Sequence, residues 1–211
     1  FEVRRQFDMS KIGIMGGTFN PIHRAHVEMG KACLDQQNLD KVLFMPSKNP
    51  PHKEKKDILS DKERADMVKL ALSEYDELEF SNFELLRQGT TYTADTLRLL
   101  QKDNPEDKYF FIMGADSLLY LDEWYKPDEI MKRAVILAIG RDCSTKSELS
   151  EKKRELIQEF PYADIRFVEM EQMPISSSEI RQSIANGENV EKYLDGEVWN
   201  YICDNHLYKM R

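Results

Sequence analysis

The 211-residue chain carries 38 acidic and 30 basic side chains, which gives a formal net charge of −8, and 41% of its residues are hydrophobic. This length fits one α/β domain with a substantial core, and the composition excludes a disordered protein. The negative charge argues against a partner nucleic acid held by a general basic field. Because no run of about 18 apolar residues occurs, we expect no membrane helix and no membrane partner.

The first residues and the cysteines indicate where the domain begins and in which compartment the protein works. Residues 1–8 lack both a periodic pattern and the apolar core of a signal peptide. We interpret them as a remnant that precedes a natural start at Met9, and we expect residues 9–211 to form a single domain. The three cysteines are odd in number and far apart, which is typical of a reducing compartment, so we expect a cytoplasmic protein.

Short apolar segments alternate with segments of helical spacing. The expected strands cover residues 11–15, 41–45, 78–85, 109–113, 134–139 and 164–168. The expected helices cover residues 23–34, 61–72, 93–100 and 146–160, and Thr93 is a plausible helix cap. This alternation predicts an α/β fold with a Rossmann-like, doubly wound parallel sheet and a small C-terminal helical part. Ligands bind at the carboxyl ends of the strands in such folds.

The first expected strand leads directly into residues 16–26 (GGTFNPIHRAH). Glycines there permit a tight turn, and the N-terminus of the following helix offers unpaired N–H groups to an anion. His23 and His26 are three residues apart, so both imidazoles should lie on one side of the first turn. Two histidines without a third ligand do not make a zinc site, and the segment is neither a dinucleotide fingerprint nor a P-loop. The pattern therefore predicts phosphate binding.

A basic segment runs against the overall charge. It begins at Lys48 and contains His52, Lys53, Lys55 and Lys56 between prolines. One interpretation is a solvated run of charges. The other is a basic loop, residues 48–56, that closes over phosphates and becomes ordered only with ligand. Both interpretations stay open at this stage.

Two further clusters have alternative interpretations. Residues 175–181 (ISSSEIR) combine a Ser176–Glu179 capping box with Arg181, so they predict a helix start and also suit an anion. Asp116 follows the strand at 109–113 and either caps a helix or meets a ribose hydroxyl. Trp124, on an expected loop, is either a core anchor or a stacking platform for a heteroaromatic ring.

Taken together, these motifs resemble those of a known superfamily. GGTFNPIHRAH is similar to G-x-F-[DN]-P-x-H-x-G-H and ISSSEIR to I-S-S-[ST]-x-[IV]-R, the paired signatures of the nucleotidyltransferases. With GADSL, the downstream Trp124 and Tyr92-Thr93, the chain from Met9 resembles the bacterial nicotinate-mononucleotide adenylyltransferases. The resemblance implies transfer of the adenylyl group of ATP to nicotinate mononucleotide, with release of pyrophosphate, in NAD biosynthesis.

The resemblance also implies roles for individual residues. His23, His26 and Arg181 would be catalytic, and Trp124 would stack on the pyridine ring of the mononucleotide with Thr93 nearby. The residues implied in ATP binding are Gly16, Gly17, Thr18, Phe19, Lys48, Gly114, Asp116, Ser177 and Ser178. Gly114 and Asp116 would meet the adenylate ribose, and the two serines would hold the β and γ phosphates.

The implied chemistry needs no protein nucleophile, because the attacking group is the 5′-phosphate of the acceptor. Catalysis would rest on aligning two anions and stabilising charge around phosphorus. A Mg²⁺ ion would be held mainly by substrate phosphates and water. The expected partners are therefore ATP and nicotinate mononucleotide, and a homo-oligomer is compatible with the sequence.

Several alternatives stay open on the residues alone. One is phosphopantetheine adenylyltransferase, which commonly has Thr in place of His23 and is usually shorter. Another is a polyol-phosphate cytidylyltransferase, which would be expected to use CTP and to end in a different helical signature. A non-catalytic nucleotide sensor would use the same fold but has less need of both histidines and Arg181. The role of Arg141 is open, because Asp142 and Cys143 follow it where relatives tend to have Pro-Gly. The choice between an acid and an amide pyridine is also open.

Overall fold

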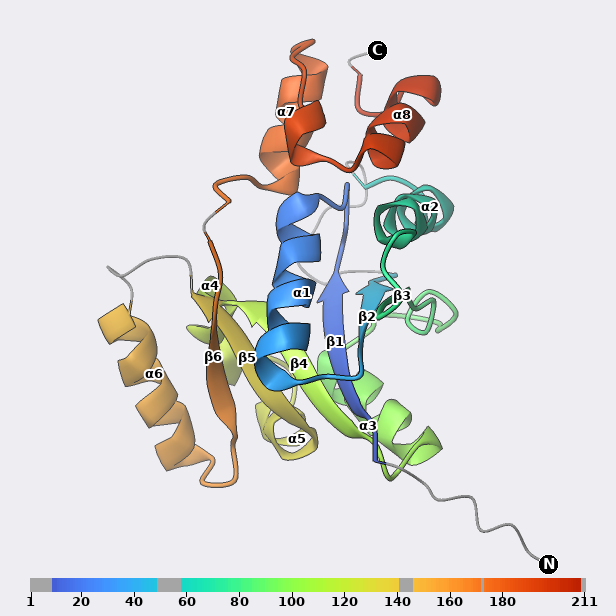
Figure 1. The fold of residues 1–211 in the computed structure, drawn as a ribbon. Coiled ribbons are helices and arrows are strands. Elements are labelled where there is room, and N and C mark those ends of the chain that lie inside the picture. Colours follow the sequence, from blue (N-terminus) through green and yellow to red (C-terminus); the bar gives the residue numbers. More distant parts are fainter. Residues whose placement is uncertain (1–8, 49–57, 141–145, 172, 210–211) are drawn as a thin grey trace, which may run out of the picture.

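The structure is a computed structural model that describes residues 9–48, 58–140, 146–171 and 173–209. Within these residues, six strands form one parallel sheet in the order β3-β2-β1-β4-β5-β6 (Figure 1). The strands are β1 (Lys11–Gly17), β2 (Lys41–Pro46), β3 (Leu78–Phe80), β4 (Lys108–Gly114), β5 (Ala134–Gly140) and β6 (Ile165–Glu169). The chain reverses its direction of winding between β1 and β4, so the ligand crevice of this topology lies at the carboxyl ends of these two strands.

Helices cover both faces of the sheet (Figure 1). They are α1 (Arg24–Gln37), α2 (Asp61–Leu72), α3 (Thr93–Asp103), α4 (Ala115–Leu118), α5 (Pro127–Arg133), α6 (Lys146–Glu159), α7 (Ser177–Ala185) and α8 (Gly196–Asp204), with 3-10 turns η2 (Leu121–Glu123) and η3 (Glu191–Tyr193). Buried residues of α1, α2, α7 and α8 join one hydrophobic core, and those of α3, α4, α5 and α6 join the other. None of the described helices is long and apolar enough to span a bilayer.

The central strands are apolar on both sides because each face of the sheet is covered. In β4, Phe110 and Ile112 lie in the core beneath α1, whereas Tyr109, Phe111 and Met113 lie in the opposite core. Successive strand residues point to opposite faces, so a strand buried on both sides has no polar alternation. The predicted Rossmann-like doubly wound sheet is confirmed, and its C-terminal helical part consists of α7 and α8, beyond the carboxyl end of β1.

The element boundaries agree with the sequence except in a few places. The helix predicted for residues 61–72 is α2 itself. The strand predicted for residues 78–85 is wrong beyond Phe80, where the chain turns. Its alternating pattern has another cause: Phe83 packs on the core, and the buried carboxylate of Glu84 accepts a 2.7 Å hydrogen bond from Thr96 Oγ1 on α3. Tyr92, not Thr93, occupies the cap position of α3.

Helix α1 packs very closely on β2 because Gly30 has no side chain. A Cβ atom built at Gly30 would lie 2.7 Å from Cζ and 3.0 Å from Cε2 of Phe44, whose side chain is fully buried. Real Cβ contacts do not come this close, so a side chain at this position forces the helix or the ring to move. The glycine thus sets the distance between α1 and the sheet, and α1 carries both histidines at its start.

We expect Gly30→Ala to lower the free energy of unfolding by up to about 2 kcal/mol, which is an overpacking cost of up to about 3 kcal/mol less a gain in helix propensity of about 1 kcal/mol. Urea denaturation measures the change. Gly196→Ala is the matched control, since its Cβ would meet no atom within 4 Å. A Gly30→Ala protein as stable as the control contradicts the prediction, and Gly30→Ala with Phe44→Leu should recover part of the loss.

Candidate active site

The turn that follows β1 has a conformation that depends on Gly17. Phe19 adopts a left-handed backbone (φ 47°), and its ring folds back so that a Cβ at Gly17 would lie 3.0 Å from two ring atoms. The ring itself is 2% exposed and belongs to the core. A ligand at this turn therefore meets the backbone of Phe19 rather than its side chain. Gly16, by contrast, is exposed at the end of the strand.

His23 and His26 come together at the start of α1, as their spacing predicts. His23 is the N-cap residue and His26 lies in the first turn, and their ring centroids are 3.8 Å apart. The Nδ1 atom of His26 accepts a 3.3 Å hydrogen bond from the backbone N–H of His23. Because Nδ1 is the acceptor, a neutral His26 ring carries its proton on Nε2, which is then a donor for an anion. The ring of Phe19 supports His26 edge-on at 5.1 Å.

The two sequence motifs from opposite ends of the chain meet in the structure. Arg181 Nη1 donates a 2.8 Å hydrogen bond to the carbonyl of Asn20, and the hydroxyl of Ser177 donates one of 2.9 Å to the carbonyl of Pro21. Figure 1 shows α7 above the upper end of α1, where α1 begins. Arg181 Nη2 also donates to Ser178 Oγ at 3.3 Å. The first turn of α7, an arginine and the histidine pair thus lie at one place.

These contacts refine what the serine motif does. Ser176 is the N-cap of α7, and its hydroxyl accepts the backbone N–H of Glu179, so the predicted helix start is confirmed. The Ser177 hydroxyl hydrogen points to protein rather than outward. The first N–H groups of an α-helix have no intrahelical acceptor. The backbone N–H groups of Ser177 and Ser178 are therefore the donors that this turn offers to an anion.

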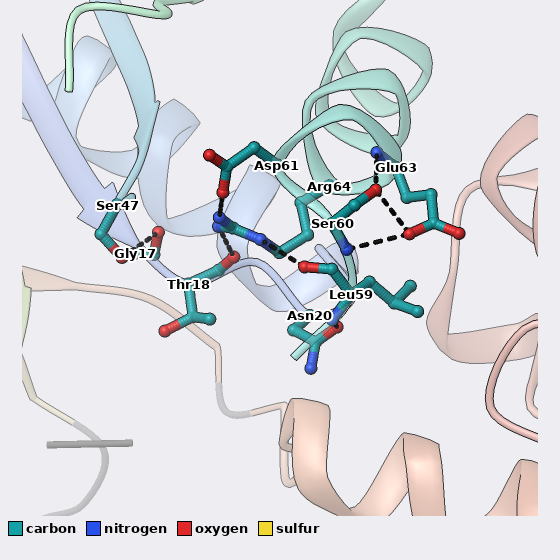
Figure 2. A network of polar contacts seen from close by, with 9 residues as sticks. All are labelled: Gly17, Thr18, Asn20, Ser47, Leu59, Ser60, Asp61, Glu63 and Arg64. Carbon is teal, nitrogen blue, oxygen red and sulfur yellow. Dashed lines mark hydrogen bonds and ion pairs between the residues drawn. The ribbon is translucent and has the colours of Figure 1, made fainter. Parts of the chain in front are cut away.

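A fully buried arginine, Arg64, holds the turn after β1 by a hydrogen bond to the carbonyl of Thr18. Figure 2 shows Arg64 donating to the carbonyls of Thr18 (2.8 Å) and Leu59 (3.2 Å) and to the carboxylate of Asp61 (2.6 Å). Its side chain is 1% exposed, and that of Asp61 is 43% exposed. The sequence interpretation missed Arg64 as a site residue. The available signal was a charged residue at a core position of an otherwise amphipathic helix.

Asn20 is a second residue that the sequence interpretation did not single out. Its side chain is 2% exposed, and its Oδ1 accepts hydrogen bonds from the Tyr208 hydroxyl (2.9 Å) and the Leu59 N–H (3.3 Å). Tyr208 lies beyond α8, close to the C-terminus. No local pattern around Tyr208 indicates this contact, because its partner is at the other end of the chain.

Near the turn, the pairing of β1 extends further on one side than on the other. Pairing between β1 and β4 extends to Ile14 and Phe111, whereas β1 stays paired with β2 up to Gly17. Gly114 ends β4 and precedes α4, whose first turn holds the exposed Asp116. Both residues lie at the carboxyl edge of the sheet, on the β4 side of the crevice. Their predicted contact with a ribose therefore has a geometric basis and stays a prediction.

Thr93 and Trp124 also belong to one region. The rings of Tyr92 and Tyr125 are in contact, with centroids 4.4 Å apart and planes tilted by 34°, and these tyrosines are the chain neighbours of Thr93 and Trp124. Trp124 is partly buried and contacts Phe111 edge-on at 6.0 Å. One part of the indole is thus anchored on the core while another part is exposed. The two interpretations of this tryptophan, anchor and stacking platform, are compatible.

Part of the expected site cannot be compared with the structure. Lys48 follows β2, where the N–H of Ser47 donates to the carbonyl of Gly17 at 2.9 Å, so Lys48 lies near the turn. The remaining residues of the predicted basic loop and Arg141 lie outside the described residues.

Comparisons with known proteins show the family to which the chain belongs. Residues 14–183 match the family model described as "Cytidylyltransferase-like". A protein of Lachnoclostridium phytofermentans named "Probable nicotinate-nucleotide adenylyltransferase" is 36% identical over 200 residues, which are 95% of this chain and 100% of the relative. One of Carboxydothermus hydrogenoformans with the same name is 39% identical over 200 residues, 95% of this chain and 98% of the relative.

A solved structure shows the same fold at lower identity. The Plasmodium falciparum nicotinic acid mononucleotide adenylyltransferase complexed with NaAD superposes with a TM-score of 0.78 at 18% identity, covering 94% of this chain and 97% of its own. The family model and the curated relatives confirm the resemblance seen in the motifs. The chain belongs to the cytidylyltransferase-like family and, within it, to the nicotinate-nucleotide adenylyltransferases.

Proposed function

We propose that this protein transfers the adenylyl group of ATP to nicotinate mononucleotide, forming nicotinate adenine dinucleotide and pyrophosphate. One observation carries the proposal: Arg181 on α7 is hydrogen-bonded to the turn that leads into the histidine pair of α1. A cationic side chain, two imidazoles and two helix N-termini together form a site for a polyphosphate. The names of the curated relatives support the choice of acceptor.

At the phosphate end, each group acts as a donor held in advance. His26 presents Nε2–H because its Nδ1 is occupied by the His23 backbone. Arg181 has a fixed orientation because Nη1 is held by the Asn20 carbonyl. Such preorganised donors stabilise charge that develops on phosphate oxygens without having to reorient during the reaction. Lys48, beside the same turn, adds a further cation.

The reaction itself forms one P–O bond and breaks another. A 5′-phosphate oxygen of the mononucleotide attacks the α-phosphorus of ATP, and the bond to the bridging oxygen of pyrophosphate breaks. The nucleophile is already an anion, so the residues' work is to align two repelling anions and to neutralise the leaving pyrophosphate. His23, His26 and Arg181 serve this second task.

A magnesium ion fits this site as a companion of the phosphates. The described residues contain no group of three or more His, Cys, Asp or Glu side chains that could hold a metal ion. Mg²⁺ takes few protein ligands when phosphates and water complete its octahedron. Bound in this way, the ion would neutralise charge on the phosphates.

The adenylate ribose and the pyridine ring would bind on the β4 side of the crevice. Gly114 and Asp116 would receive the adenylate ribose, with Asp116 as an acceptor for its hydroxyls. Trp124 would stack on the pyridine ring, with Thr93 nearby. A structural neighbour from Plasmodium falciparum was solved with NaAD and also with APC, which supports a site for both nucleotides in this fold.

The first test measures pyrophosphate release with ATP and Mg²⁺ while three acceptors are compared: nicotinate mononucleotide, nicotinamide mononucleotide and phosphopantetheine. We expect turnover with the nicotinate acceptor and much weaker turnover with the others. Activity with phosphopantetheine alone contradicts the proposed acceptor. Binding of ATP with no turnover of any acceptor indicates a nucleotide sensor.

A second test concerns His26. We expect His26→Ala to lower kcat by about 10²–10³-fold, since it removes one donor to the developing charge, while the KM for ATP changes far less. Steady-state kinetics with ATP varied separates the two constants. His206→Asn is the control, because His206 is exposed and its left-handed backbone suits asparagine. Equal losses in kcat and in ATP affinity count against a role in the transition state.

A third test concerns Trp124. We expect Trp124→Ala to raise the KM for nicotinate mononucleotide by about tenfold, the scale of one lost base-stacking contact, with less effect on the KM for ATP. Trp124→Phe keeps an aromatic ring against Phe111 and should retain most of the affinity. A change in the KM for ATP alone shows that the indole contacts adenine instead.

A further inference from the structure

The C-terminal segment beyond α8 reaches the active-site turn through one buried hydroxyl. Tyr208 is packed against the core beneath α1, and its hydroxyl donates a 2.9 Å hydrogen bond to Asn20 Oδ1. Burial raises the pKa of this hydroxyl far above its ordinary value. The hydroxyl is therefore protonated at neutral pH and is the donor in this contact.

The tyrosine is held on a rigid support. Leu207, its neighbour, is 7% exposed in the core, and its N–H donates to the carbonyl of Ile202 at 3.0 Å. His206 and Tyr208 both adopt left-handed backbones (φ 52° and 62°), which turn the chain back towards the turn after β1. The position of the hydroxyl is thus determined by the packing of α8 rather than by a free chain end.

Asn20 connects Tyr208 to Arg181, because its side chain contacts the tyrosine and its backbone carbonyl contacts the arginine. Its Oδ1 is shared between Tyr208 and the N–H of Leu59, which fixes the plane of the side chain. Its backbone carbonyl is the acceptor that holds Arg181 Nη1 at 2.8 Å. A backbone rotation at Asn20 would displace its Oδ1 from Tyr208 and Leu59 and its carbonyl from the guanidinium at the same time, so the contacts of the side chain restrain the carbonyl.

Charged groups surround the tyrosine from several elements. Burial raises the pKa of the hydroxyl most, Arg181 on α7 and Arg64 on α2 lower this pKa, and Glu63 on α2 raises it; burial outweighs the two arginines. Arg181 is therefore near Tyr208 while its hydrogen bonds go to Asn20 and Ser178. The tyrosine does not replace a ligand contact of Arg181, and it acts on Arg181 through Asn20.

We propose that Tyr208 is a positioning residue for phosphate binding: its hydroxyl fixes Asn20, whose carbonyl orients Arg181 towards the leaving pyrophosphate. This inference rests on the proposed function for the role of Arg181. The C-terminal segment then contributes to substrate binding without touching substrate.

A double-mutant cycle with inorganic pyrophosphate tests the inference by calorimetry. We expect Tyr208→Phe, which keeps the ring and removes the hydroxyl, to weaken pyrophosphate binding about fivefold, the equivalent of one hydrogen bond of about 1 kcal/mol. In the Arg181→Gln background the same substitution should change the affinity less than about twofold, because the group through which it acts is gone. A merely structural role weakens binding equally in both backgrounds and overturns the inference.

Two further variants complete the test. Tyr201→Phe is the matched control, because its hydroxyl contacts Asp66 Oδ2 at 3.4 Å on the same side of the molecule, and it should leave pyrophosphate affinity unchanged. Asn20→Ala removes the acceptor by another route and should reproduce the fivefold loss if Tyr208→Phe does not fold. A loss with Tyr201→Phe as large as that with Tyr208→Phe contradicts a specific role.

The outcomes separate this inference from the proposed function. A protein that makes nicotinate adenine dinucleotide but shows no effect of Tyr208→Phe on pyrophosphate binding overturns the inference alone. Coupling between Tyr208 and Arg181 in a protein that turns over none of the acceptors upholds the inference and contradicts the proposed function. Wild-type pyrophosphate affinity in Arg181→Gln overturns the inference together with the proposed role of that arginine.

Discussion

The turn after β1 depends on the buried guanidinium of Arg64. A cation removed from water costs several kcal/mol unless acceptors surround it, so its N–H groups must be satisfied. The acceptors are two backbone carbonyls, of Thr18 and Leu59, and the carboxylate of Asp61 (Figure 2). Because the carbonyls belong to segments outside helices and strands, satisfying the charge also fixes those segments. An aliphatic side chain of similar volume would fill the space but leave both carbonyls without donors.

The turn held by Arg64 connects to the active site in two ways. The turn held at Thr18 continues through Asn20 to the histidine pair at the start of α1, and α7 docks on the same turn through Arg181 and Ser177. Each contact is a hydrogen bond to a carbonyl of the turn, so its backbone acts as the common support of both motifs. Donors that are already in place when substrate binds do not have to reorient during the reaction. Preorganised dipoles lower the activation barrier for this reason.

Local physical chemistry explains which elements were predictable. The helix at residues 61–72 has acids early and a lysine late, and the apolar segments of β4 and β5 have the length and composition of strands buried on both faces. Residues 78–85 misled the prediction because tertiary contacts bury Glu84 and partly bury Phe83. Arg64 was missed because a charged residue in α2 is normally assigned to the solvent face. Two of its three acceptors are backbone carbonyls, which leave no mark in a sequence.

The sequence by itself determined the alternation of strands and helices, the glycine turn, the paired histidines and the serine–arginine helix start, because each depends on neighbours within a few residues. It left the serine motif open between a cap and an anion site. Only the tertiary structure joined Arg181 to Asn20, and Asn20 to Tyr208, from opposite ends of the chain. Such contacts follow from how the sheet brings helix ends to one edge, and no periodicity or spacing encodes them.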